Sequence, residues 1–140
     1  MSILVDTGAW YAIADTSDRH HKEAKHFYIN QAAKTSFLTT DLILAETWTL
    51  INSHIGRSAA RIFWETLRET RIPILTIEPV DLEAAWRVSV HFSDQRFSLV
   101  DCCTFALMER MGVVEVFTFD AHFLTYRFGT KRQHVFLCHP

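Results

Sequence analysis

Short apolar runs alternate along this chain with longer segments of helical periodicity. In the longer segments, apolar residues recur at intervals of three and four, as in helices with one buried face. Strands that are separated by helices favour parallel pairing with right-handed crossovers. We therefore expect an α/β fold, a short and mostly parallel sheet of four or five strands with helices on both faces. The predicted strands are Ile3–Val5, Ser36–Thr39, Ile74–Ile77, Val113–Thr118 and Val135–Leu137.

Capping residues mark the ends of several predicted helices. Asp41 and Ser58 stand at two expected N-caps, Pro79 opens a first turn and Gly112 ends the most apolar segment. The predicted helices are 9–14, 20–34, 42–53, 58–70, 79–90 and 98–111, with a short turn or helix at 121–126.

Length and composition predict a single domain over residues 1–140. Domains average roughly 150 residues, and 49% of this chain is hydrophobic with only four glycines and three prolines, which excludes a disordered or low-complexity chain. No apolar stretch reaches the roughly 18 residues of a membrane span. Cys102, Cys103 and Cys138 lack zinc-site spacing and cannot form a complete disulfide set. We expect a cytoplasmic protein without membrane association, with reduced and buried cysteines.

Two acidic residues follow predicted strands. Asp6 comes directly after Ile3–Val5, and Asp120 comes after the run that ends at Phe119. In α/β folds the carboxyl ends of the strands form the edge where ligands bind. Capping a helix or closing a turn is the structural alternative for each residue.

Two further acids are predicted to lie on buried helix faces. Glu46 has Leu42 and Leu50 one turn away on either side, and Asp101 lies in the most apolar segment of the chain. A lone buried carboxylate costs several kcal/mol unless it is paired or bound to a metal. Asp101 has a structural alternative, because Ser98 and Asp101 fit a capping box.

The four acids together predict a shared site for a hard cation. Oxygen ligands favour Mg²⁺ or Mn²⁺, and such an ion activates water and neutralises phosphate charge, so it suits phosphodiester hydrolysis. Converging carboxylates should also raise the pKa of at least one of them. The candidate residues that support this site are Thr7, Ser98, Thr118 and His122.

The charge pattern bears on a nucleic-acid substrate. The formal net charge of −2 excludes binding through bulk positive charge, so contacts with phosphate must be local. Arg127, Lys131 and Arg132 follow Asp120 closely and are the candidate phosphate contacts. The arginines of segment 57–68 form a second basic group, for which a solvated helix face is the simpler interpretation.

A regulatory module with an acidic Mg²⁺ pocket, like a response-regulator receiver, is a competing hypothesis. That design requires adjacent acids after the first strand, whereas Asp6 stands alone. A non-catalytic interaction module with an unused acidic pocket is a third hypothesis. The sequence contains no HExxH zinc motif and no glycine-rich phosphate loop.

Several segments resemble the PIN domain, and specifically the VapC-type toxin ribonucleases of bacterial toxin–antitoxin pairs. The opening Ile3–Trp10 and the segment Asp41–Glu46 resemble the first two acidic motifs of that family. Residues 97–112 and 117–123 carry the longest and most specific matches. Gly8 and Cys103 depart from the pattern, since a small hydroxyl residue is common there.

The resemblance implies a single PIN-like domain and a Mg²⁺- or Mn²⁺-dependent endoribonuclease. It also implies a homodimer that is inhibited by a small antitoxin encoded beside it. Some PIN domains process RNA without an antitoxin, and that alternative stays open. The residues that match the four catalytic and metal-binding acids of the family are Asp6, Glu46, Asp101 and Asp120.

The first four helices carry more large aromatic side chains than one buried face of each requires. We expect some of them to form a dimer contact or an antitoxin groove, because aromatic anchors dominate protein interfaces. Burial of all of them in the core is the alternative. The residues are Trp10, Tyr11, Phe27, Trp48, Phe63 and Trp64.

Overall fold

A five-stranded sheet forms the centre of the computed structural model, which describes residues 1–140. The strand order is β3-β2-β1-β4-β5, and every neighbouring pair is parallel. The predicted parallel α/β architecture is confirmed. The strands are β1 (Ser2–Val5), β2 (Ser36–Thr40), β3 (Ile74–Leu75), β4 (Glu115–Phe117) and β5 (Leu137–His139).

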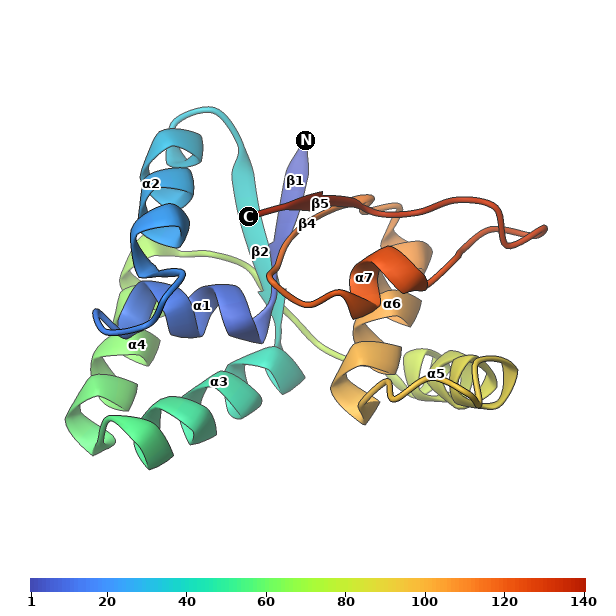
Figure 1. Cartoon of the computed structure of the whole chain (residues 1–140), viewed down its shortest axis with the longest axis horizontal. Helices are drawn as coiled ribbons and strands as arrows, with labels where there is room; N and C mark the ends of the chain where they lie inside the picture. The colour runs from blue at the N-terminus through green and yellow to red at the C-terminus, as the bar shows by residue number, and fades with distance from the viewer.

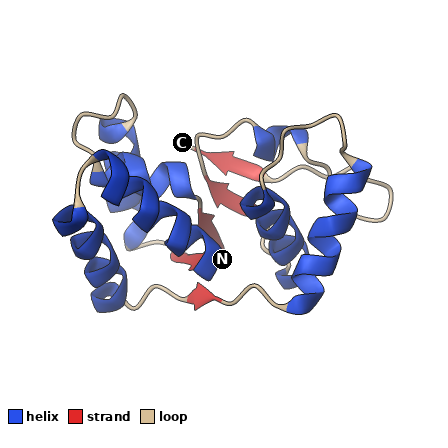
Figure 2. Cartoon of the chain, turned by 90° about the horizontal axis from the view of Figure 1, so that it is seen from below, coloured by secondary structure: helices blue, strands red, loops and turns tan.

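Seven helices lie in two groups on opposite sides of the sheet. Helices α1 to α4 lie on one side and α5 to α7 on the other, with the strands between them (Figures 1 and 2). None of the helices has both the length and the apolar composition that crossing a bilayer requires. The helices are α1 (Thr7–Ala14), α2 (His21–Ala32), α3 (Asp41–His54), α4 (Arg57–Thr70), α5 (Pro79–His91), α6 (Leu99–Met111) and α7 (His122–Thr125).

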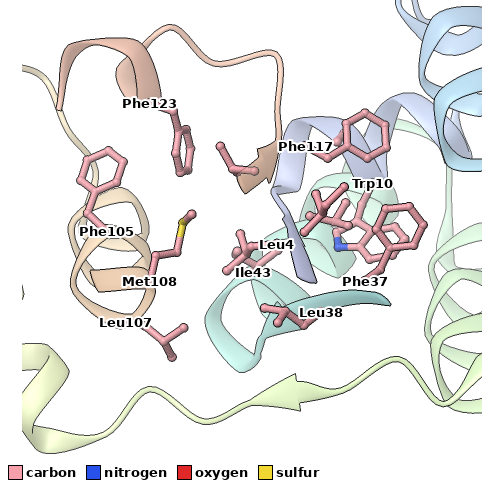
Figure 3. Packing of buried hydrophobic residues seen from close by; sticks show 14 of the residues in the cluster. Leu4, Trp10, Phe37, Leu38, Ile43, Phe105, Leu107, Met108, Phe117 and Phe123 are labelled. Atoms are coloured by element: carbon pink, nitrogen blue, oxygen red, sulfur yellow. The ribbon is translucent and has the colours of Figure 1, made fainter. Parts of the chain in front are cut away.

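The hydrophobic core fills both faces of the sheet. Figure 3 shows Phe105 and Met108 of α6 on one side of the strands and Trp10 of α1 on the other. Eight consecutive residues of α6, 101–108, are buried, so this helix is surrounded on all sides. Cys102 and Cys103 are buried as expected, and Cys138 is partly exposed.

Two of the predicted N-caps are wrong. Thr40, not Asp41, caps α3, because its backbone is already extended at the end of β2 and its hydroxyl accepts a hydrogen bond from the Ile43 amide. The Asp41 carboxylate instead accepts from the Ile77 amide. Helix α4 is capped by Gly56 rather than Ser58.

The edge strands differ from their predicted bounds. β3 ends at Leu75 instead of Ile77, because the Ile77 amide donates to the Asp41 side chain and not to a neighbouring strand. β5 begins at Leu137 instead of Val135, where its register with Glu115 of β4 starts. An edge strand pairs with only one neighbouring strand, so the residues where it starts and ends depend on long-range contacts. Hydrophobic patterning does not predict these contacts.

Replacing Gly112 by alanine is expected to destabilise the protein by about 1 kcal/mol. Gly112 ends α6 with a φ of 69°, in the left-handed region that a Cβ atom disfavours. Gly8→Ala is the matched control, because Gly8 lies in α1 with open space where the alanine methyl group would stand and has no positive φ. Urea denaturation of both variants measures the difference. Equal stabilities of the two variants would contradict this assignment.

Candidate functional site

The first acid, Asp6, lies at the point where the connections between strands change from one side of β1 to the other. The chain goes from β1 to β2 on one side and later returns to β4 on the other, so the carboxyl ends of β1 and β4 flank a topological switch point. Asp6 follows β1 there, and its amide donates to the Phe117 carbonyl at the end of β4 (3.0 Å). The side chain is buried, with 6% of the residue exposed. The Thr118 hydroxyl donates to its Oδ2 atom at 3.0 Å.

The environment of Asp6 raises the pKa of its carboxyl group from 3.8 to about 7. Burial is the largest cause, and the charges of Asp101 and Asp120 add to it. Hydrogen bonds from the Thr7 amide and the Thr118 hydroxyl oppose the shift. The expectation that one acid has a raised pKa is confirmed, but desolvation contributes more than repulsion between the acids.

Asp101, Asp120 and His122 form a cluster of side chains beside Asp6. One ligand atom from each of the three lies within 4.8 Å of the others. His122 Nδ1 lies 2.8 Å from Asp101 Oδ2 and 3.4 Å from Asp120 Oδ1, and the His122 amide donates to Asp120 Oδ1 at 2.9 Å. Nδ1 therefore faces only carboxylate oxygens in this cluster.

Asp101 both caps α6 and belongs to the acidic cluster. Its Oδ2 atom accepts from the Ser98 amide at 2.9 Å, and Ser98 Oγ accepts from the Asp101 amide at 3.0 Å. The same Oδ2 faces His122. The capping and site interpretations of the sequence are thus compatible, because the cap orients the carboxylate toward the cluster.

Glu46 reaches the site from α3 and is less buried than the sequence predicted. The Thr7 hydroxyl at the start of α1 donates to Glu46 Oε1. Glu46 and its neighbours Leu42 and Leu50 are only partly buried. The predicted buried face is therefore confirmed only in part. Ile43 is fully buried and Leu42 packs against the core, whereas Glu46 and Leu50 line an open cleft.

A cleft of about 740 Å³ contains all four acids. The predicted supporting residues Thr7, Ser98 and His122 also line it. So do four residues that were not predicted: Arg19, Arg96 and the stacked pair of His20 and Phe119. Thr118 does not line the cleft and instead contacts Asp6. The sequence offers one weak signal for Arg19. The helix that starts beside Asp6 has only about two turns, so the chain moves a short distance from Asp6 before it reaches Arg19.

The basic residues after Asp120 do not reach this cleft. Arg127 Nη1 donates to the backbone carbonyls of Leu124, Thr125 and Tyr126. The Arg132 guanidinium lies 5.6 Å from the centre of the Phe92 ring, and Lys131 is exposed. None of the three lines the cleft, whose arginines come from other segments.

Comparisons with known proteins agree with this fold. Residues 3–129 match the PIN domain family. The chain is 31% identical over 122 residues to the 23S rRNA-specific endonuclease VapC20 of Mycobacterium tuberculosis, covering 86% of this chain and 91% of the relative. The crystal structure of that sarcin–ricin loop cleaving toxin superposes with a TM-score of 0.80 and 30% identity, over 88% of this chain and 93% of the other.

A more distant structure shares the fold alone. VapBC2 from Rickettsia felis, bound to a DNA fragment from its promoter, superposes with a TM-score of 0.71 at 9% identity, over 99% of this chain and 98% of the other. The family match covers nearly the whole chain and includes the four converging acids. This protein therefore belongs to the PIN domain family.

Proposed function

We propose that this chain is a VapC-type endoribonuclease that hydrolyses RNA phosphodiester bonds with a divalent metal ion. The observation that carries the proposal is the convergence of four acids on one cleft at the switch point of the sheet: Asp6, Glu46, Asp101 and Asp120. The similarity to an endonuclease along most of the chain supports the same reaction.

The donor atoms suit Mg²⁺ or Mn²⁺. Four carboxylates supply oxygen ligands only, which hard cations prefer. His122 Nδ1, 2.8 Å from Asp101 Oδ2, adds one nitrogen to this cluster. We propose that Asp6, Glu46, Asp101 and Asp120 hold the ion. When bound, the ion lowers the pKa of a coordinated water and offsets charge on the attacked phosphate.

The polar neighbours of the acids keep the carboxylates in place. Thr118 holds Asp6, and Thr7 holds Glu46. The Ser98 amide and His122 together hold Asp101, and His122 also links Asp101 to Asp120. Such second-layer contacts orient ligands and set their basicity. Burial of Asp6 excludes water from one side of the site.

Cleavage of RNA is expected to require Mn²⁺ or Mg²⁺ and to stop when EDTA is added. Asp101→Asn and Asp120→Asn should each lower the cleavage rate by about a hundredfold or more, because each removes a charged ligand. Asp94→Asn, an exposed acid outside the cleft, is the matched control and should cleave normally. Undiminished cleavage by Asp101→Asn would rule out the proposed metal site.

We propose ribosomal RNA as the substrate class, because the 31% identical relative is named as specific for 23S rRNA. Incubation of purified 23S rRNA, 16S rRNA and tRNA with the protein and Mn²⁺ tests this, with cleavage positions mapped by primer extension. A single dominant position in 23S rRNA is the expected result. Equal cutting of all three RNAs would overturn this specificity.

We also propose a small antitoxin and a second copy of the chain as protein partners. An apolar groove of about 350 Å³ between α1, α2 and α4 supports an interaction surface. Trp10 and Phe63 are buried beneath it, Ile62 is exposed at it, and Trp64 is half-exposed beyond it. Co-expression with the adjacent small reading frame, followed by purification and sedimentation, tests both partners. A monomer without a copurifying chain would contradict both.

A further inference from the structure

Two arginines stand unpaired among the acids of the cleft. Arg19 comes from the segment between α1 and α2, and Arg96 from the segment just before α6. Five carboxylates line the same cleft, yet the only arginine that forms ion pairs in this structure is Arg110. Both side chains are exposed. Two guanidinium groups therefore remain available to an anionic ligand in an otherwise acidic cleft.

Arg19 is held in place by a short chain of contacts that leads to the acidic cluster. Its Nε atom donates to His20 Nε2 at 3.2 Å. The His20 ring stacks on Phe119, with ring centres 4.2 Å apart and planes 10° from parallel. Phe119 directly precedes Asp120. Because only Nε is occupied, both terminal amino groups of Arg19 are free to donate to a ligand.

The two arginines approach the acids from different sides of the molecule. The segment that carries Arg19 belongs to the helix group on one side of the sheet, and the segment that carries Arg96 belongs to the group on the other (Figure 1). A polynucleotide whose reacting phosphate meets the acids would place its neighbouring phosphates near these segments. Guanidinium groups bind phosphate oxygens in pairs and are the favoured phosphate contacts of proteins.

We infer that Arg19 and Arg96 bind the RNA phosphates that flank the one being cleaved, and that His20, stacked on Phe119, is a positioning residue for Arg19. The inference rests on the proposed ribonuclease function. It assigns phosphate binding to residues far apart in sequence instead of to the basic run 127–132. It also explains how a cleft lined by five acids can accept a polyanion, since the arginines offset the repulsion at its rims.

The test measures RNA binding separately from cleavage. A fluorescein-labelled single-stranded oligoribonucleotide is titrated with protein in Ca²⁺, at several salt concentrations, and its integrity is checked on a gel. Arg19→Ala and Arg96→Ala should each weaken binding about tenfold and lower the slope of log K against log salt by about 0.7, the loss of one phosphate contact. Arg87→Ala, an exposed arginine of α5 outside the cleft, should change neither quantity.

His20→Ala tests the positioning role through non-additivity. The change should weaken RNA binding when Arg19 is present and have no further effect in the Arg19→Ala background. A purely structural role for His20 would instead weaken binding equally in both backgrounds, and that result would overturn its assignment.

The outcomes separate this inference from the proposed function. If the wild type binds and cleaves RNA but Arg19→Ala and Arg96→Ala behave like Arg87→Ala, the inference is wrong and the function stands. If the wild type binds RNA without cleaving it in Mn²⁺, and both arginine variants still lose affinity and salt dependence, the function fails and the inference stands. Absence of any RNA binding by the wild type overturns the inference.

Discussion

Asp6→Asn is expected to abolish RNA cleavage and yet to stabilise the metal-free protein, by on the order of 3 kcal/mol above neutral pH. Burial raises the pKa of Asp6 from 3.8 to about 7. The folded state therefore binds a proton more tightly than the unfolded state does. Stability falls as the pH rises from about 4 to about 7, and it stays low above that range. Asparagine keeps the shape of the side chain and removes the charge that causes this loss.

Urea denaturation in EDTA at about pH 5 and about pH 8 measures this effect. The wild type should lose stability between the two values relative to Asp6→Asn, and Asp94→Asn should follow the wild type. Mn²⁺ at a hundredfold excess over its dissociation constant should stabilise the wild type by about 2.7 kcal/mol, and most of this gain should be absent in Asp6→Asn. A variant less stable than the wild type at both pH values would show that Asp6 is a structural acid.

Asp81→Asn is expected to destabilise the protein by about 3 kcal/mol, with no direct effect on the cleft. Asp81 is buried in α5, and its two oxygens accept from Arg110 Nε at 2.7 Å and Nη2 at 2.9 Å. Oδ2 also accepts from the Glu78 amide in a capping box. The variant loses the charge that pairs with Arg110, and this pair joins α5 to α6, the helix that carries Asp101.

The hydrogen bonds from Arg110 lower the pKa of Asp81. Its folded pKa therefore lies below the unfolded value, so the pair stabilises the protein above the unfolded pKa of about 3.9 and this contribution is lost as the pH falls through the folded pKa. Denaturation of wild type, Asp81→Asn and the exposed control Glu83→Gln at neutral pH measures the difference. If Asp81→Asn lowered the free energy of unfolding by less than about 1 kcal/mol, the prediction would be wrong, and the pair would contribute no more than a surface ion pair does.

Local sequence was sufficient to place three of the four acids. Asp6 and Asp120 follow runs that form β1 and β4, and parallel strands bring their carboxyl ends to one edge of the sheet. Asp101 stands at the third position of a helix that Ser98 caps, which a motif of four residues already indicates. These features depend on neighbours within a few residues, so hydrophobic patterning and capping rules can predict them.

Glu46 shows where such rules stop. Helical periodicity assigned it correctly to the face that carries Leu42 and Leu50, but periodicity describes a face and not what lies opposite. Leu42 packs against the core, but Glu46 and Leu50 line the cleft. The degree of burial of Glu46 was decided by the direction of the helix.

A parallel α/β sheet and the acids at its carboxyl edge could be predicted from the residues alone, because the alternation of strands with helices and the positions of strand ends are local properties. Which cations reach the acids depends on the packing of distant segments: Arg19 and Arg96 line the cleft, while Arg127 donates to nearby carbonyls. Such packing also pairs Asp81 with Arg110, 29 residues away. The contacts of long side chains depend on how helices pack and on the paths of loops. Proximity in sequence predicts neither of these.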